Sequence, residues 1–204
     1  MNSTRTALLM LDYQVALCDG GPHGRMPQLA EQVAQRGVLE TAARVLAAAR
    51  AARWPVFHVR LAFEPSYALR TNRLPRFEPY ETQRAMLADS PEARIVDAVA
   101  PLDTEPVVDK GCVDPFVGTP LLPALAAAGV GHVVLGGVAT NLVVESTARH
   151  ASDAGLRVTV VEDMCASFRP DFHAFSVQHM LPLFSTVTTA AAVIPTFEIE
   201  EVAR

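Results

Sequence analysis

Three features that could do chemistry follow apolar runs in this chain. Asp12 follows residues 5–11 (RTALLML), Lys110 follows residues 106–109 (PVVD), and the turn 138–143 (VATNLV) follows the glycine-ended run 133–137 (VVLGG). A carboxylate can transfer a proton, an ammonium group can hold an anion, and backbone N–H groups at a turn can stabilise an oxyanion. Because open α/β sheets bind ligands at the carboxyl ends of their strands, we predict one site formed by all three.

The basic residues single out Lys110. Of the 17 basic residues, only Lys110 is a lysine, and the remaining 16 are arginines. A chain with such a preference for arginine keeps a lysine where a compact ammonium with a tunable pKa is required, which arginine does not supply. We therefore interpret Lys110 as a functional residue.

Apolar runs alternate with helical periodicity along the whole chain. Runs that read as buried strands lie at 5–11, 56–60, 106–109, 133–137, 157–161 and 186–188, and helical patterns lie at about 26–53, 120–128, 141–155 and 170–182. This alternation predicts an α/β protein with a three-layer α/β/α architecture and a six-stranded, mostly parallel, Rossmann-like doubly wound sheet. With 204 residues, we expect a single domain spanning 1–204.

Composition and missing motifs exclude several function classes. The net charge is −5 without a basic block, so we expect no nucleic-acid partner, and the lack of an apolar run of about 18 residues argues against a membrane protein. Three widely spaced cysteines and an N-terminus without a signal pattern favour a cytoplasmic protein. The sequence contains no GxGxxG, GxxxxGK[ST] or GxSxG motif, so we expect neither a nucleotide cofactor nor a serine hydrolase.

Residues 61–90 form the least regular part of the chain and are candidates for a substrate loop. They contain three prolines and the evenly spaced Arg70, Arg73 and Arg76, which could hold a substrate carboxylate or form solvated pairs with nearby glutamates. A small-molecule substrate is the expected partner. The side chains that we expect to contact it are Gln14, Arg60, Arg73, Phe116, Thr140 and Asn141.

Three segments carry a resemblance to a known family. Resemblance to the isochorismatase-like hydrolases, which include nicotinamidases and other cysteine hydrolases, is carried by LLMLDYQ, PVVDKGCVDPFVGTPL and GGVATNLVVESTARHASDAGLRVTVVEDMCAS. These segments are spread over residues 8–167, so the resemblance extends over most of the chain. The resemblance implies a homodimer or homotetramer and assigns catalysis to Asp12 and Lys110. It also implies a cis peptide at Val138–Ala139 and an oxyanion hole formed by the backbone N–H groups of Ala139 and Val143.

The sequence departs from the cysteine branch of that family at the nucleophile. The fourth position of the T-N-x-C pattern is Val143, and valine cannot attack a carbonyl group. The DxH metal pattern of nicotinamidases is also missing, so we expect no metal.

Three functional hypotheses remain for a hydrolase of this kind acting on a small carboxylated or carbonyl-bearing metabolite. In the first, which follows the isochorismatase branch, Asp12 is the general acid that protonates a vinyl ether, and water completes the hydrolysis. In the second, Asp12-activated water or a relocated thiol, Cys112 or Cys18, cleaves a C–N bond such as an amide or imide. In the third, the chain is a catalytically inactive ligand-binding homologue.

Overall fold

The sheet places the carboxyl ends of β1 and β4 next to each other. The computed structural model describes residues 5–202, which contain β1 (Arg5–Leu11), β2 (Val56–Leu61), β3 (Val107–Lys110), β4 (Val130–Gly137), β5 (Arg157–Val161) and β6 (Thr186–Thr188). The strand order is β3-β2-β1-β4-β5-β6, and every pair is parallel. The strand order reverses between β1 and β4, which is where doubly wound sheets open a crevice for a ligand.

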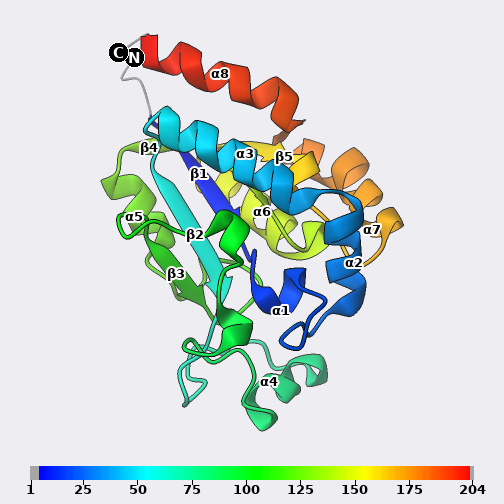
Figure 1. Cartoon of the computed structure of the whole chain (residues 1–204). Helices are drawn as coiled ribbons and strands as arrows, with labels where there is room; N and C mark the ends of the chain where they lie inside the picture. The colour runs from blue at the N-terminus through cyan, green and yellow to red at the C-terminus, as the bar shows by residue number, and fades with distance from the viewer. Residues whose placement is uncertain (1–4, 203–204) are drawn as a thin grey trace.

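Helices cover both faces of the sheet, which confirms the predicted three-layer architecture. They are α1 (Val15–Cys18), α2 (Pro27–Gln35), α3 (Val38–Ala51), α4 (Glu78–Thr82), α5 (Leu121–Ala127), α6 (Glu145–Asp153), α7 (Pro170–Phe175) and α8 (Ala190–Val202). Figure 1 shows α3 and α8 side by side on one face. Within the described residues, no helix has the length and apolar character needed to cross a bilayer.

The alternating side chains of β1 divide the hydrophobic core into two halves. Leu8 and Met10 belong to the cluster that includes α3 and α8, whereas Leu9 and Leu11 belong to the cluster that includes α5 and α6. A strand apolar on both faces is buried on both sides, as the continuous apolar run predicts. The first strand is thus fixed firmly, and its carboxyl end is a rigid place for Asp12.

Three helical segments differ from the sequence prediction. The pattern at 26–53 forms two helices, because Gly37 between α2 and α3 adopts a left-handed conformation with φ of 62°. The pattern at 170–182 begins as α7 and continues as a π-helical turn and a 3-10 turn, the latter containing Pro182. Helix α8 was not predicted, and it contains Pro195, which breaks the usual helical signal.

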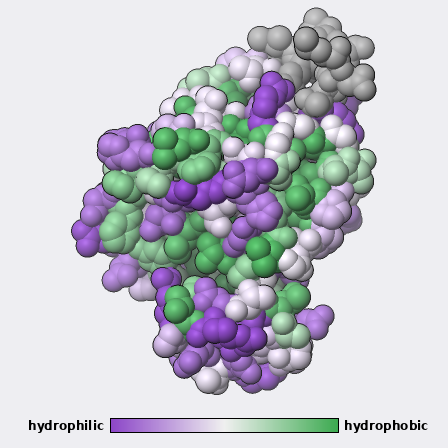
Figure 2. All heavy atoms as spheres, turned by 180° about the vertical axis from the view of Figure 1, so that it is seen from behind, coloured by the Kyte–Doolittle hydropathy of each residue, from purple (hydrophilic) through white to green (hydrophobic). Residues whose placement is uncertain are grey.

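The segment 62–90 projects beyond the carboxyl ends of the strands. It contains only α4 and a short 3-10 turn, Pro75–Phe77, and it has an apolar cluster of its own that includes Phe63, Tyr67 and Met86. Figure 1 shows α4 in this projection, below the end of β2, and Figure 2 shows hydrophilic side chains over the same end of the molecule seen from behind. The segment is therefore placed to cover a site at the strand ends.

Candidate active site

Asp12 and Lys110 form a buried ion pair at the carboxyl ends of β1 and β3. Nζ of Lys110 lies 2.9 Å from Oδ2 of Asp12, and both side chains are almost completely shielded from solvent. Strand β2 lies between β1 and β3, so the long lysine side chain is needed to span the distance. Asp12 has a φ of 58°, a left-handed conformation that is uncommon outside glycine and frequent at functional sites.

The environment of Asp12 favours its protonated form. Burial raises the pKa of the Asp12 carboxyl above its ordinary value of 3.8, although the charge of Lys110 and its hydrogen bond act in the opposite direction. Among the residues that the structure describes, Oδ1 of Asp12 has no hydrogen-bond partner. A carboxyl group with a raised pKa and a free oxygen is suited to exchange a proton with a ligand.

The loop after Lys110 joins the ion pair to the projecting segment. Nζ of Lys110 also donates a hydrogen bond to the carbonyl oxygen of Cys112, at 2.9 Å. Gly111 packs so closely on the backbone of Leu69 that a Cβ atom at position 111 would lie 1.8 Å from the Leu69 carbonyl oxygen. Only glycine fits there, and its contact fixes the segment 62–90 relative to Lys110.

The turn after β4 forms the second wall of the site. The Val138–Ala139 peptide is cis, as the family resemblance implies, and a π-helical turn, Thr140–Val144, follows it. Gly137 lies against the backbone of Leu11, where a Cβ atom would be 2.3 Å from the Leu11 carbonyl oxygen. The end of β1 and this turn are thereby held in close contact, and the side chain at the usual nucleophile position is the buried isopropyl group of Val143.

A polar network that runs from the buried Thr140 to the surface residue Arg36 supports the turn from behind. The hydroxyl group of Thr140 lies 2.8 Å from Nδ1 of His173, and Nε2 of His173 lies 3.3 Å from Glu162, which pairs with Arg36 at 2.9 Å. Burial lowers the pKa of His173, as does the charge of Arg36, while Glu162 raises it. His173 is therefore held by hydrogen bonds, and in the described part of the chain no group of three or more His, Cys, Asp or Glu side chains could hold a metal ion.

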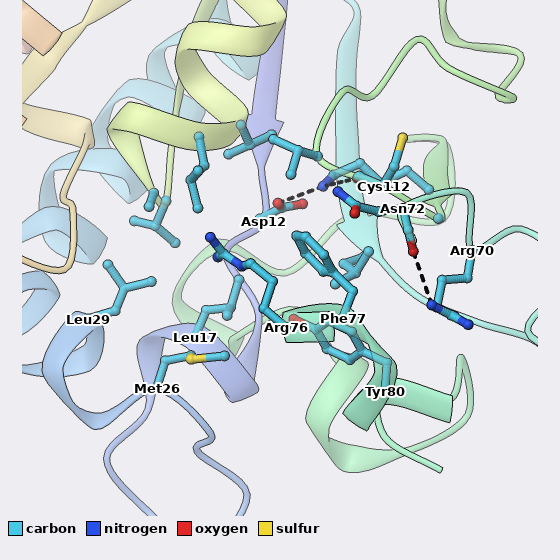
Figure 3. A pocket seen from close by; sticks show the side chains of 18 of the residues that line it. Asp12, Leu17, Met26, Leu29, Arg70, Asn72, Arg76, Phe77, Tyr80 and Cys112 are labelled. Carbon is cyan, nitrogen blue, oxygen red and sulfur yellow. Dashed lines mark hydrogen bonds and ion pairs between the residues drawn. The ribbon is translucent and has the colours of Figure 1, made fainter. Parts of the chain in front are cut away.

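A single cavity joins these elements. Five of the predicted site residues line it, namely Asp12, Lys110, Val138, Ala139 and Val143. Its polar wall also includes residues of the projecting segment: Arg70, Asn72, Arg76 and Tyr80. Figure 3 shows Asp12 in the middle of the lining side chains, with a dashed line for its ion pair with Lys110, and the guanidinium group of Arg76 on the side of Leu17 and Leu29.

Three of the predicted substrate contacts lie outside the cavity lining, and two of them have other partners. The side-chain amide of Gln14 is saturated by the backbone of Leu61 and Ala93, and the guanidinium group of Arg60 pairs with Asp109 at 2.6 Å. Arg73 is exposed and does not line the cavity. Their positions near strand ends or in the substrate loop did not reveal which way their side chains point.

The other three predicted contacts also lie away from the cavity lining. Phe116 is buried against the ring of His150, with 4.7 Å between ring centroids. The Thr140 hydroxyl group contacts His173, and the Asn141 side chain accepts a hydrogen bond from Ser167. The polar residues Thr140 and Asn141 thus hold the turn in place, and the neighbouring apolar residue Leu142 lines the cavity.

The thiols are poorly placed for nucleophilic attack. Cys112 lines the cavity, but Figure 3 shows its sulfur pointing away from Asp12, and Sγ donates a hydrogen bond to the Asp114 carbonyl oxygen at 3.4 Å. Cys18 and Cys165 are buried outside the cavity lining, and burial raises the pKa of both, that of Cys165 to about 12. Cys18 and Cys165 therefore do not resemble activated thiolates, and the Cys112 sulfur is directed away from the acid.

Arg76 is the notable cavity residue that the sequence prediction did not select. It lies three residues after Arg73, and an irregular segment gives no periodicity from which to decide which of the two faces inward. The structure places Arg76 at the 3-10 turn Pro75–Phe77, with its guanidinium carbon 4.9 Å from the centre of the Phe77 ring. Proline at position 75 was the available signal for such a turn.

A family model and the most similar relatives found point to the same family of proteins. The sequence matches the family described as Isochorismatase domain over residues 6–192. It is 29% identical over 203 residues to the uncharacterized isochorismatase family protein YecD of Escherichia coli O157:H7, covering 95% of this chain and 97% of that protein. It is 30% identical over 169 residues to the maleamate amidohydrolase of Pseudomonas putida, and this match covers 83% of this chain and 76% of that protein.

The fold is shared with solved structures. The crystal structure of a cysteine hydrolase from Pseudomonas syringae pv. phaseolicola 1448A superimposes with a TM-score of 0.83 at 25% sequence identity. The match covers 97% of this chain and 94% of that one. The similarity therefore extends over the sheet, the helices on both faces and the segments that line the cavity.

Proposed function

This chain belongs to the isochorismatase family of hydrolases, and we propose that it hydrolyses a small carboxylated metabolite through Asp12 and Lys110 without a thiol nucleophile. The observation that carries this proposal is the combination of a buried carboxyl with a raised pKa and a nucleophile position occupied by Val143. A site with a proton donor but no nucleophile suits reactions in which protonation makes the substrate reactive toward water.

The reaction that this arrangement supports best is hydrolysis of a vinyl ether. The Asp12 carboxyl proton moves to the terminal methylene carbon, whose π electrons form the new C–H bond, and the oxygen-bearing carbon becomes an oxocarbenium ion. Water adds to that carbon and returns a proton to the Asp12 carboxylate. The resulting hemiketal then passes its hydroxyl proton to the leaving oxygen and separates into a carbonyl compound and an alcohol. Asp12 ends the cycle as it began, protonated.

Lys110 and Arg76 take different parts in this proposal. Lys110, 2.9 Å from Asp12, limits how far the pKa of the acid rises and stabilises the carboxylate that forms when the proton leaves. Arg76 lines the cavity and has no ion-pair partner among the described residues, whereas its neighbour Arg70 is paired with Glu81 at 2.8 Å. We therefore assign the substrate carboxylate to Arg76, in place of Arg73 and Arg60.

A second candidate reaction is hydrolysis of a C–N bond. The similarity to a maleamate amidohydrolase favours it, and so do the positions of Ala139 and Val143 on the cavity wall, where their N–H groups could receive an oxyanion. Here the Asp12 carboxylate would act as the base that takes a proton from water. Because the pKa of Asp12 is raised, its carboxylate is a stronger base, but a smaller fraction of the protein carries that carboxylate at a given pH. The rate of this reaction should therefore increase as the pH rises.

A substrate panel separates these reactions. Vinyl ethers of pyruvate, primary amides and imides are each incubated with the wild-type protein and with the variants Asp12→Asn and Cys112→Ala. Pyruvate, ammonia and the amic acid formed when an imide opens are measured, and imide opening counts with ammonia release as C–N hydrolysis. We expect pyruvate release that requires Asp12 and not Cys112. Ammonia release that requires Asp12 favours the second reaction, and turnover that requires Cys112 contradicts both. If no compound is turned over, the proposal fails in favour of an inactive ligand-binding homologue.

A further inference from the structure

One side of the cavity is apolar and is not used by the reaction proposed above. Five side chains form this apolar compartment: Leu17, Met26, Leu29, Leu142 and Phe168. Figure 3 shows Leu17, Met26 and Leu29 on the opposite side of Asp12 from Asn72, Arg70 and Cys112. The guanidinium group of Arg76 reaches toward the side of Leu17 and Leu29, so a carboxylate bound to Arg76 would lie beside this hydrocarbon wall.

The walls of the apolar compartment are part of the hydrophobic core. Leu29 is buried in the core cluster that includes α3, and the other four side chains pack against that same cluster. They come from four different parts of the chain, namely α1, the start of α2, the turn after β4 and the loop after β5. A wall held by the core keeps its shape, so its apolar surface facing the cavity is available to a ligand and is stabilised when hydrocarbon covers it.

The size of the cavity limits the group that the apolar compartment can hold. The cavity measures about 80 Å³. An engineered apolar cavity of about 150 Å³ in another protein holds benzene, and the whole of the present cavity has roughly half that volume. A short branched or unsaturated hydrocarbon group fits this space better than a ring.

From these observations we propose that the apolar compartment is a substrate subsite for a short branched or unsaturated hydrocarbon group, so that the natural substrate is a small aliphatic carboxylate. This inference rests on the proposed function for the position of the carboxylate at Arg76 and of the reacting bond at Asp12. It adds the chemical class of the remaining part of the substrate. Molecules with a polar or aromatic group in this place are excluded from the substrate class by the composition and size of the compartment.

Binding of simple acids tests the subsite without any hydrolysis. Dissociation constants of acetate, propionate, isobutyrate, isovalerate and benzoate are measured by ligand-observed NMR with the wild-type protein. Burial of each added methylene group should strengthen binding about fourfold up to isovalerate, and benzoate should bind more weakly than isovalerate. Equal affinity along the series, or tightest binding of benzoate, would overturn the inference.

Substitutions at Leu142 change the compartment in opposite directions. Leu142→Ala enlarges it and should make benzoate bind at least as tightly as isovalerate, while Leu142→Phe fills it and should shift the preference to acetate and propionate. Leu74→Ala removes an exposed leucine that lies outside the cavity lining and should leave the order of affinities unchanged. An unaltered order in both Leu142 variants would contradict the assignment of the subsite.

The outcome for the subsite and the outcome for the reaction can be told apart. If the acids bind in the expected order but neither vinyl ethers nor amides are hydrolysed, the inference stands and the proposed function fails. If vinyl ethers are hydrolysed with a kcat/KM that does not change between methyl- and isopropyl-substituted compounds, the proposed function stands and the inference fails.

Discussion

The ammonium group of Lys110 lies 2.9 Å from the Asp12 carboxylate in a place from which water is almost excluded. Two effects on the pKa of Asp12 oppose each other there, and burial, which raises it, is larger than the effect of Lys110, which lowers it. The pair therefore gives the site an acid that is weaker than an exposed aspartic acid but can still release its proton. This balance is what a general acid requires, and it can be tested directly.

Removal of Lys110 should move the pH profile toward alkaline values. In Lys110→Met the lowering effect on Asp12 is lost, so the pKa of Asp12 rises further and the acid stays protonated to higher pH. We expect the alkaline limb of kcat/KM to shift upward, while the maximal rate falls about 10²- to 10⁴-fold because the carboxylate formed on proton transfer has lost its cation. The measurement is kcat/KM against pH for the substrate identified in the panel.

A matched loss of positive charge outside the cavity provides the control for Lys110→Met. Arg73→Gln removes a cation that is exposed and does not line the cavity, so its pH profile should follow that of the wild-type protein. A Lys110→Met profile whose acidic limb moves to higher pH while its alkaline limb stays in place would show that Asp12 acts as a base.

Arg76 and Arg73 should differ sharply although they are three residues apart. A charge-assisted hydrogen bond to a carboxylate contributes about 1.5–3 kcal/mol, so Arg76→Gln should raise KM about 10- to 100-fold for carboxylated substrates. For the corresponding esters, which lack the negative charge, the increase in KM should be much smaller. If Arg76→Gln and Arg73→Gln raised KM by the same factor, the two arginines would act only through the long-range positive charge of the segment and not through a contact with the substrate.

The thiols should be dispensable. Because the Cys112 sulfur points away from Asp12 and bonds to the Asp114 carbonyl group, Cys112→Ala should change kcat about threefold or less, the usual size of a small packing change. The check is kcat of the variant beside alkylation of the wild-type protein with iodoacetamide, followed by mass spectrometry. Inactivation in proportion to labelling of Cys112, together with a large loss in Cys112→Ala, would assign catalysis to the thiol.

The sequence was sufficient to predict the sheet and the ends of its strands. Asp12 and Val138 follow directly after β1 and β4, and Lys110 is the last residue of β3. Parallel packing brings such positions to one edge regardless of the loops between them. The substrate contacts were less predictable. Gln14 and Asn141 have the right polarity and position, but their side chains form hydrogen bonds inside the protein, and no local pattern distinguishes these from contacts to a ligand.

The segment 62–90 was the hardest part of the site to predict from the sequence, for a similar reason. Which arginine of the segment faces the cavity depends on the 3-10 turn Pro75–Phe77 and on the close approach of Gly111 to Leu69, and both are tertiary features. The break between α2 and α3 at Gly37 is a milder case, since the residue is visible in the sequence but its left-handed conformation is not. Residues in periodic elements were therefore easier to place than those whose position depends on contacts between loops.

Glu105 should make stability depend on acidic pH at the end of the sheet opposite the cavity. Burial opposes ionisation of Glu105, but hydrogen bonds from Arg50, the Leu102 amide and His58, together with the charge of Arg50, outweigh it and lower its pKa from 4.5 to about 2. A carboxylate whose pKa is lower in the folded state stabilises the protein above the ordinary pKa, and this contribution is lost as the pH falls toward 2. Because Arg50 is partly exposed, we expect a contribution of about 2 kcal/mol at neutral pH.

The variant Glu105→Gln tests this contribution by urea denaturation at pH 7, 4 and 3. It should be less stable than the wild-type protein by about 2 kcal/mol at pH 7. The difference should shrink as the pH falls below 4.5, because Glu105 of the unfolded chain then takes up a proton while Glu105 of the folded protein stays ionised until the pH approaches 2. Glu64→Gln, at an exposed position, should match the wild-type protein at each pH. A constant difference between Glu105→Gln and the wild-type protein from pH 7 to 3 would mean that Glu105 contributes through hydrogen bonds alone and not through its charge.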